Sequence, residues 1–190
     1  MGNFGTLDVD FLEEWLKYGE QRKEEPYQFI SYYIAFNFLY NKYERDDKTP
    51  ERGGQRGREF SQIEKFIKIH YYNNAKIKID FGSLFEELAF DSEYFIDDVK
   101  SNQKNNRNNS VKFADKEIIK MGKMNLRDKK MAVEELFYAI YLVRCNLFHG
   151  NKKLINEGER NLRLLEDGSK VLKRLLKDYL KAYKNYEGGY

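Results

Sequence analysis

The stretch PYQFISYYIAFNFLYNKYER, which begins at Pro26, restricts the fold more than any other part of this chain. Its aromatic residues recur at offsets of four and three, the period of an α-helix: Phe29, Tyr33, Phe36, Tyr40 and Tyr43. Between Phe29 and Tyr40 the helix is apolar on nearly every side, so we expect it to lie at the centre of the protein. Asn37 interrupts the apolar run, and a buried amide there must find hydrogen-bond partners.

Four further helices are predicted around the central one, at about residues 8–22, 59–72, 128–148 and 159–184. Long helices with short connections favour a helix bundle. We therefore predict an all-α, up-and-down helical bundle of about five main helices. The chain of 190 residues is expected to form a single helical domain, residues 1–190, with a polar insertion at about 91–127.

Apolar residues mark the side that each outer helix is expected to bury. In the first helix these are Phe11, Leu12, Trp15, Leu16 and Tyr18. In the last helix they are Leu162, Leu165, Leu172, Leu176, Tyr179 and Tyr183. Gly168 and Ser169 interrupt the last pattern and predict either a kink or a break. Pro26 suits the first turn of the central helix.

Composition and charge narrow the class of protein. No apolar run approaches the roughly 18–20 residues that span a bilayer, and four acidic residues fall where a signal peptide would be apolar. A single cysteine, Cys145, suits a reducing compartment, so a cytoplasmic location without membrane contact is expected. The net charge is only +3, but residues 101–153 hold 12 Lys/Arg against 5 Asp/Glu, which is +7 and leaves −4 elsewhere. This asymmetry indicates either a polyanionic partner or chance clustering on solvated faces.

Three segments carry weaker signals. The loop at 46–58 holds Arg52, Arg56 and Arg58 among glycines, and it is either a plain solvated connection or a contact for RNA phosphates. His70 is expected at a helix edge as a hydrogen-bonded structural histidine. The sequence KIKID (76–80) alternates like a strand but has no evident partner.

The stretch LVRCNLFHGNK (142–152) holds the candidate site. Arg144 occupies a mostly aromatic row of the fourth helix with Val133, Phe137, Tyr141 and Phe148, at the edge of the face that is expected to be buried. An arginine keeps its charge, so it must pair with an acidic group, extend to solvent or meet a ligand anion. Gly150 favours a helix end. Helix-end electrostatics alone could also account for the cations here.

The motif RCNLFHG resembles the R-x4-H motif of the HEPN superfamily (higher eukaryotes and prokaryotes nucleotide-binding domains). Its setting is similar too, because it ends a long penultimate helix that an amphipathic C-terminal helix follows. The upstream IAFNFLYNKY resembles an aromatic helix of several bacterial HEPN-like groups. The resemblance covers most of the chain outside residues 91–127. The motif departs from the family at Cys145, where a polar residue is common, and at Asn151, where some toxins have a tyrosine.

The resemblance implies a homodimeric, metal-independent endoribonuclease of a toxin–antitoxin or defence system, with RNA as substrate and an antitoxin or another protein as a possible partner. Arg144 and His149 would be the catalytic pair in a shared cleft, with Asn146 in support. Lys152 and Lys153 would bind phosphate, and no metal or other cofactor is expected. The alternatives are a catalytically inactive HEPN-like module that binds RNA or protein, and a purely structural helical protein.

Overall fold

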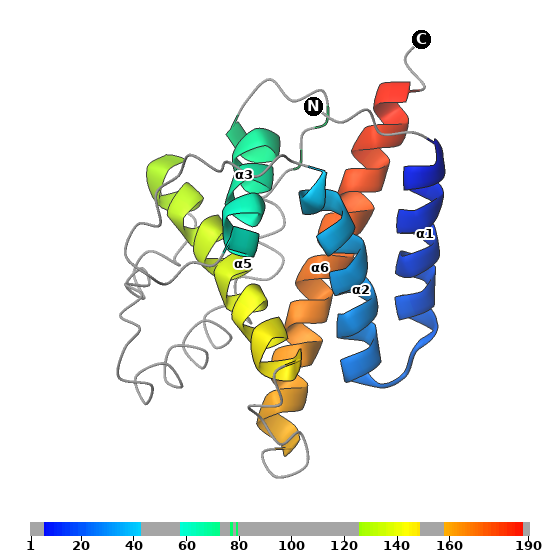
Figure 1. Ribbon diagram of the computed structural model, residues 1–190, viewed down its shortest axis with the longest axis vertical. Coiled ribbons are helices and arrows are strands. Elements are labelled where there is room, and N and C mark those ends of the chain that lie inside the picture. Colours follow the sequence, from blue (N-terminus) through cyan, green and yellow to red (C-terminus); the bar gives the residue numbers. More distant parts are fainter. Residues whose placement is uncertain are drawn as a thin grey trace.

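The computed structural model describes residues 6–42, 58–72, 77, 79, 126–148 and 158–187 (Figure 1). These residues form the helices α1 (Thr6–Gln21), α2 (Glu25–Asn41), α3 (Arg58–Tyr72), α5 (Leu126–Phe148) and α6 (Gly158–Glu187). No strand occurs in the described part of the chain. The predicted all-α helical bundle is therefore confirmed, and the bounds of the four outer helices differ from the predicted ones by three residues at most. Helix α2 ends at Asn41, and Tyr43 of the predicted aromatic pattern lies outside the described residues.

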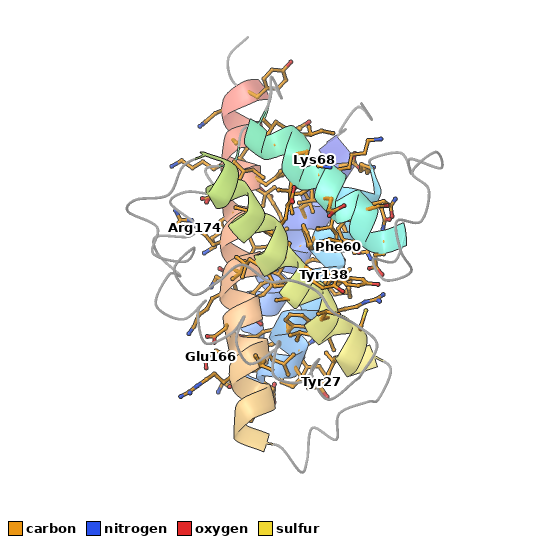
Figure 2. All side chains as sticks on the ribbon, turned by 90° about the vertical axis from the view of Figure 1, so that its left-hand side faces the viewer. Tyr27, Phe60, Lys68, Tyr138, Glu166 and Arg174 are labelled. Carbon is orange, nitrogen blue, oxygen red and sulfur yellow. The ribbon has the colours of Figure 1, made fainter. Side chains whose placement is uncertain are left out.

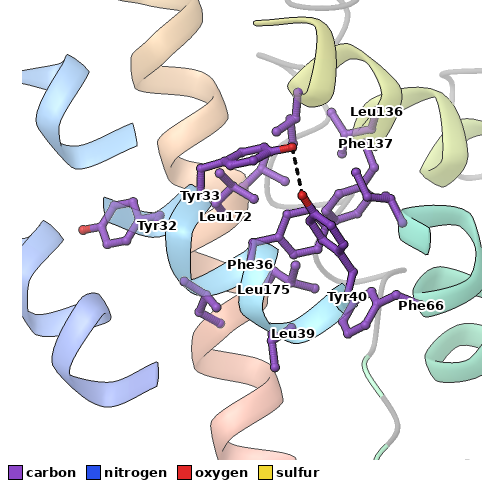
Figure 3. Packing of buried hydrophobic residues seen from close by; sticks show 14 of the residues in the cluster. Tyr32, Tyr33, Phe36, Leu39, Tyr40, Phe66, Leu136, Phe137, Leu172 and Leu175 are labelled. Atoms are coloured by element: carbon purple, nitrogen blue, oxygen red, sulfur yellow. Dashed lines mark hydrogen bonds between the residues drawn. The ribbon is translucent and has the colours of Figure 1, made fainter. Parts of the chain in front are cut away.

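Helix α2 lies at the centre of the bundle, as its all-round apolar surface predicts. It packs against α1, α3 and α6, and it buries eight residues: Phe29, Ser31, Tyr32, Tyr33, Ala35, Phe36, Leu39 and Tyr40. The Phe36 ring contacts both α3 and α5 on the other side of the bundle (Figure 3). Its centroid lies 5.3 Å from that of Phe137 in α5 and 5.7 Å from that of Phe66 in α3. Such tilted and edge-on pairs add to the stabilisation from burial alone.

Helices α1 and α2 run antiparallel and pack closely (Figure 1). The turn between them is held by the Gln28 side-chain amide, which donates to the Arg22 carbonyl at 2.6 Å. Pro26 lies in the first turn of α2, as predicted. A Cβ atom at Gly19 would come within 2.4 Å of the Tyr32 ring, so only glycine permits this approach of α1 to α2.

Helix α6 runs without a break through Gly168 and Ser169, so the prediction of a break there is wrong. Ser169 is buried. A continuous helix keeps the leucines on either side of these two residues on one buried face. Two assignments to buried faces are also corrected, because Leu162 is 38% exposed and Tyr18 is 44% exposed.

His70 is a buried structural histidine rather than a residue at a helix edge. It is 4% exposed, and its Nδ1 lies 2.7 Å from the Ile77 carbonyl oxygen. Its ring packs against Phe66 and Tyr179. Burial lowers the pKa of His70, although the bond to Ile77 opposes that effect. Ile77 and Ile79 are the described residues of KIKID, and neither belongs to a strand.

Two predicted segments lie outside the described residues: the loop at 46–58 and the insertion at 91–127. The exceptions are Arg58, which begins α3, and Leu126 and Arg127, which begin α5. The single-domain organisation over residues 1–190 stays a prediction. None of the described helices combines the length and apolarity that crossing a bilayer requires.

Candidate functional site

Arg144 lies in the C-terminal part of α5, on the side that faces α2 and α3. Val133 and Phe137, earlier in the same row, are fully buried, while Tyr141 and Arg144 are half-buried. The Arg144 side chain is 26% exposed. The predicted position of this arginine at the edge of the buried face is therefore confirmed.

An ion pair with Glu59 holds the Arg144 guanidinium. Arg144 Nη1 lies 3.2 Å from Glu59 Oε2, and the Glu59 side chain is only 22% exposed. The guanidinium carbon also lies 5.6 Å from the centre of the Tyr33 ring, which provides a weaker cation–π contact. A partly buried arginine must pair with an acidic group, extend to solvent or meet a ligand anion. The described contacts of Arg144 show the first of these, pairing with an acidic group.

The other carboxylate oxygen of Glu59 joins two tyrosines of α2. The Tyr33 hydroxyl donates to Glu59 Oε1 at 3.2 Å, and the Tyr40 hydroxyl donates to the same oxygen. The two hydroxyl oxygens lie 3.5 Å apart (Figure 3). Glu59 therefore connects the first turn of α3 to the central helix and to α5 through one carboxylate.

Asn37 extends this network towards the end of α2. Its amide Nδ2 donates to the Tyr40 hydroxyl oxygen at 2.6 Å, and its Oδ1 accepts a bond from the Asn41 amide. The requirement that Asn37 find partners is thus met within its own helix. We refer to Tyr33, Asn37, Tyr40, Glu59 and Arg144 together as the Glu59 network.

The pKa values of the groups in this network determine which of them donate hydrogen bonds. Burial is the main cause that raises the pKa of both Tyr33 and Tyr40 well above the ordinary range of a phenol, and the Glu59 carboxylate acts in the same direction. Both tyrosines therefore remain protonated donors at any physiological pH. Desolvation is the largest single influence on the pKa of Arg144 and acts to lower it, but Glu59, Tyr33 and Cys145 together outweigh it and the pKa is raised. The network therefore places the Arg144 guanidinium beside the Glu59 carboxylate.

Cys145 and Tyr141 are neighbours of Arg144 in α5, and both are half-buried. The Arg144 Nη1 donates to Cys145 Sγ at 3.9 Å, and burial, followed by a hydrogen bond to Cys145, raises the pKa of Tyr141. The Cys145 thiol is half-buried and carries no disulfide. The Cys145 sulfur is therefore one of the described contacts of the guanidinium.

The remaining predicted site residues are not placed by the structure. His149, Lys152 and Lys153 lie outside the described residues, and Asn146 is described only as a backbone position of α5. The proximity of His149 to Arg144, and the roles of Asn146, Lys152 and Lys153, stay predictions. Within the described ranges, no group of His, Cys, Asp or Glu side chains is arranged to hold a metal ion.

Glu59 is the residue that sequence reasoning missed. Alone in the sequence it is typical of the acidic residues that favour the first turn of a helix. The useful signal was Arg144, because a charged residue in an aromatic row requires a counter-ion somewhere in the fold. The sequence did not indicate which acidic residue supplies it.

Comparison with known proteins adds no relative. No protein-family model matches this chain, and neither a curated protein nor a solved structure matches it. The functional interpretation therefore depends on the residues themselves.

Proposed function

We propose that this protein is a metal-independent endoribonuclease of HEPN type. It acts as a homodimer in a toxin or defence context in the cytoplasm, with Arg144 and His149 of both chains in a shared cleft and with an antitoxin or another protein as possible partner. The observation that carries the proposal is the restrained Arg144. A guanidinium held by Glu59 and placed over Tyr33 loses little freedom when it binds a phosphate.

The chemistry needs no metal. His149 would take the proton of a ribose 2′-hydroxyl, whose oxygen would attack the adjacent phosphorus. The bond from phosphorus to the 5′-oxygen would break, and that oxygen would take up a proton. The products are a 2′,3′-cyclic phosphate and a 5′-hydroxyl. Arg144 would stabilise the charge on the phosphate through its planar fork of N–H donors, and His149 of the second chain could supply the proton for the leaving group.

One observation favours a second candidate, an inactive HEPN-like module that binds RNA or protein. The Arg144–Glu59 pair and the two tyrosine bonds already satisfy charges within the protein. Such a network can stabilise a bundle without any ligand. The two candidates differ in whether bound RNA is cleaved in the absence of metal.

The test uses purified protein, a fluorescent RNA and a metal chelator. Wild-type protein is expected to cleave the RNA, and Arg144→Ala and His149→Ala are each expected to abolish cleavage while circular dichroism shows a folded helical protein. Arg22→Ala is the matched control, because Arg22 lies on the α1–α2 turn and stacks on Tyr18. Undiminished cleavage in both active-site variants would refute the catalytic assignment, and binding without cleavage by wild type would favour the inactive module. Sedimentation should give the mass of a dimer.

A further inference from the structure

The exposed face of α6 carries a row of lysines that the candidate site does not use. Lys173, Lys177, Lys181 and Lys184 follow at offsets of four, four and three, so they lie on one side of the helix. We name these four residues the lysine row. The side chains of Lys173, Lys177 and Lys184 are 38%, 49% and 61% exposed, so their ammonium groups reach water.

The charge of this face differs from that of the rest of α6. Lys170, one turn earlier, is balanced by Glu166 at 3.1 Å and Asp167 at 3.4 Å. Arg174, which points away from the bundle in Figure 2, is held by both oxygens of Asp178 at 2.9 and 3.0 Å. The positive charge that these acidic residues do not balance is therefore concentrated in the lysine row.

Helix α1 contributes carboxylates to the lysine row, but too few to neutralise it. One oxygen of Glu20 lies 3.1 Å from Lys173 Nζ and 2.8 Å from Lys177 Nζ, and Glu13 pairs with Lys184 at 2.5 Å. The Lys177 bond is the largest cause that lowers the pKa of Glu20, so this carboxylate stays ionised. Adding Lys17 of α1 gives five lysines against two glutamates, a local balance of 5 − 2 = +3.

These residues border a groove between α1 and α6. The groove has a volume of about 430 Å³, and its walls include Lys17, Lys181 and Lys184 beside the apolar Leu16 and Leu180. Lysines beside an apolar floor suit a single strand, because its phosphates can meet the ammonium groups while the flat faces of its bases contact the leucines. A surface for a neutral apolar partner would not place so many ammonium groups around the same floor.

We propose that the lysine row and the α1–α6 groove bind the phosphate backbone of a single-stranded nucleic acid. Lys184 lies 11 positions after Lys173, a rise of about 16 Å at 1.5 Å per residue. That length accommodates several successive phosphates. The choice of nucleic acid over an acidic protein rests on the proposed ribonuclease function, whereas the charge and the groove stand without it. The row would hold the strand, and the chemistry would remain at Arg144.

The experiment measures binding without cleavage. A fluorescent deoxythymidine 20-mer has no 2′-hydroxyl, so its anisotropy reports binding even by an active enzyme. Wild-type protein is titrated at several salt concentrations, and the slope of log Kobs against log [salt] is determined. Each phosphate contact with a single strand contributes about −0.7 to that slope. Lys17→Gln/Lys181→Gln is expected to reduce the magnitude of the slope by about 1.4, and it leaves the Glu13 and Glu20 ion pairs intact.

A matched control separates a defined site from diffuse charge. Lys23→Gln/Lys68→Gln removes two charges as well, from an exposed lysine of the α1–α2 turn and from exposed Lys68 of α3, which Figure 2 labels. This double variant should leave the slope unchanged. Equal reductions in the two double variants would overturn the proposal, as would no binding by wild type at low salt. Competition by poly-glutamate at equal charge would instead assign the row to an acidic protein. Arg144→Ala removes one phosphate contact of the candidate site at most, about 0.7 in slope. The reduction caused by Lys17→Gln/Lys181→Gln should therefore persist in an Arg144→Ala background, which keeps failure of the ribonuclease proposal distinguishable.

Discussion

Replacing Glu59 by Gln tests the Glu59 network directly. The substitution keeps the size of the side chain and an acceptor oxygen for Tyr33 and Tyr40, but it removes the charge that pairs with Arg144. The two tyrosine bonds fall from charge-assisted to neutral strength, and the guanidinium loses its ion pair with Glu59. We expect the free energy of unfolding to decrease, with the loss shared between these effects.

The expected magnitude follows from the exposure of the pair. Breaking a fully buried ion pair costs about 3–5 kcal/mol, but the side chains here are 26% and 22% exposed, so solvent reduces that cost. Hydrogen bonds to charged groups are worth about 1.5–3 kcal/mol and neutral ones about 1 kcal/mol. We therefore expect Glu59→Gln to destabilise the protein by about 2–3 kcal/mol, which corresponds to roughly 5–10 °C in Tm for a chain of this length.

The measurement is urea unfolding followed by circular dichroism, with Glu166→Gln as the matched control. Glu166 also pairs with a cation, Lys170, but the two side chains are 53% and 45% exposed. The same substitution there should cost only about 0.3–0.5 kcal/mol. A double-mutant cycle with Arg144→Gln should give a coupling of about 1–2 kcal/mol. If Glu59→Gln cost no more than Glu166→Gln, the Glu59 network would not stabilise the fold and the argument for a restrained Arg144 would fail.

Two further predictions concern the packing around α2 and α3. Gly19→Ala should destabilise the protein by about 1–3 kcal/mol despite the better helix propensity of alanine, because the new methyl group would clash with the Tyr32 ring. In a Tyr32→Ala background the clash is absent, so chemical denaturation should show no such cost. The lowered pKa of buried His70 means that the folded state favours the neutral imidazole ring. This preference stabilises the folded protein fully above the unfolded pKa of about 6.5, and the stabilisation decreases as the pH falls below that value. Urea unfolding at two pH values should therefore show a smaller loss on acidification for His70→Phe than for wild type, and equal losses would contradict this reasoning.

Local pattern was sufficient to predict most of the fold. The central place of α2 followed from an apolar surface on all sides, and the bounds of the outer helices followed from helical periodicity. The errors concern α6 and α1, where Gly168 and Ser169 continue a helix and where Leu162 and Tyr18 reach solvent. Periodicity assigns a residue to a face of its helix. It does not determine how far other helices cover that face, and therefore which of its residues are exposed.

The candidate site was predicted only in part. Arg144 was singled out because its charge conflicts with its aromatic row, which is a property of α5 alone. Glu59 lies 85 residues earlier, since 144 − 59 = 85, and it has no local feature that sets it apart from other acidic residues of a first helical turn. Its pairing with Arg144, and its bonds to Tyr33 and Tyr40, depend on how α2, α3 and α5 pack.

The lysine row shows the same difference between what local sequence predicts and what depends on the packing of helices. The sequence by itself determined the helices, the central α2 and the need of Arg144 for a counter-ion, because each depends on residues a few positions apart. Only the tertiary structure decided that Glu59 meets that need and that Glu20 of α1 shares its carboxylate between two lysines of α6. Electrostatic energy depends on the distance between charges in space, and packing sets that distance between helices that are remote in the chain.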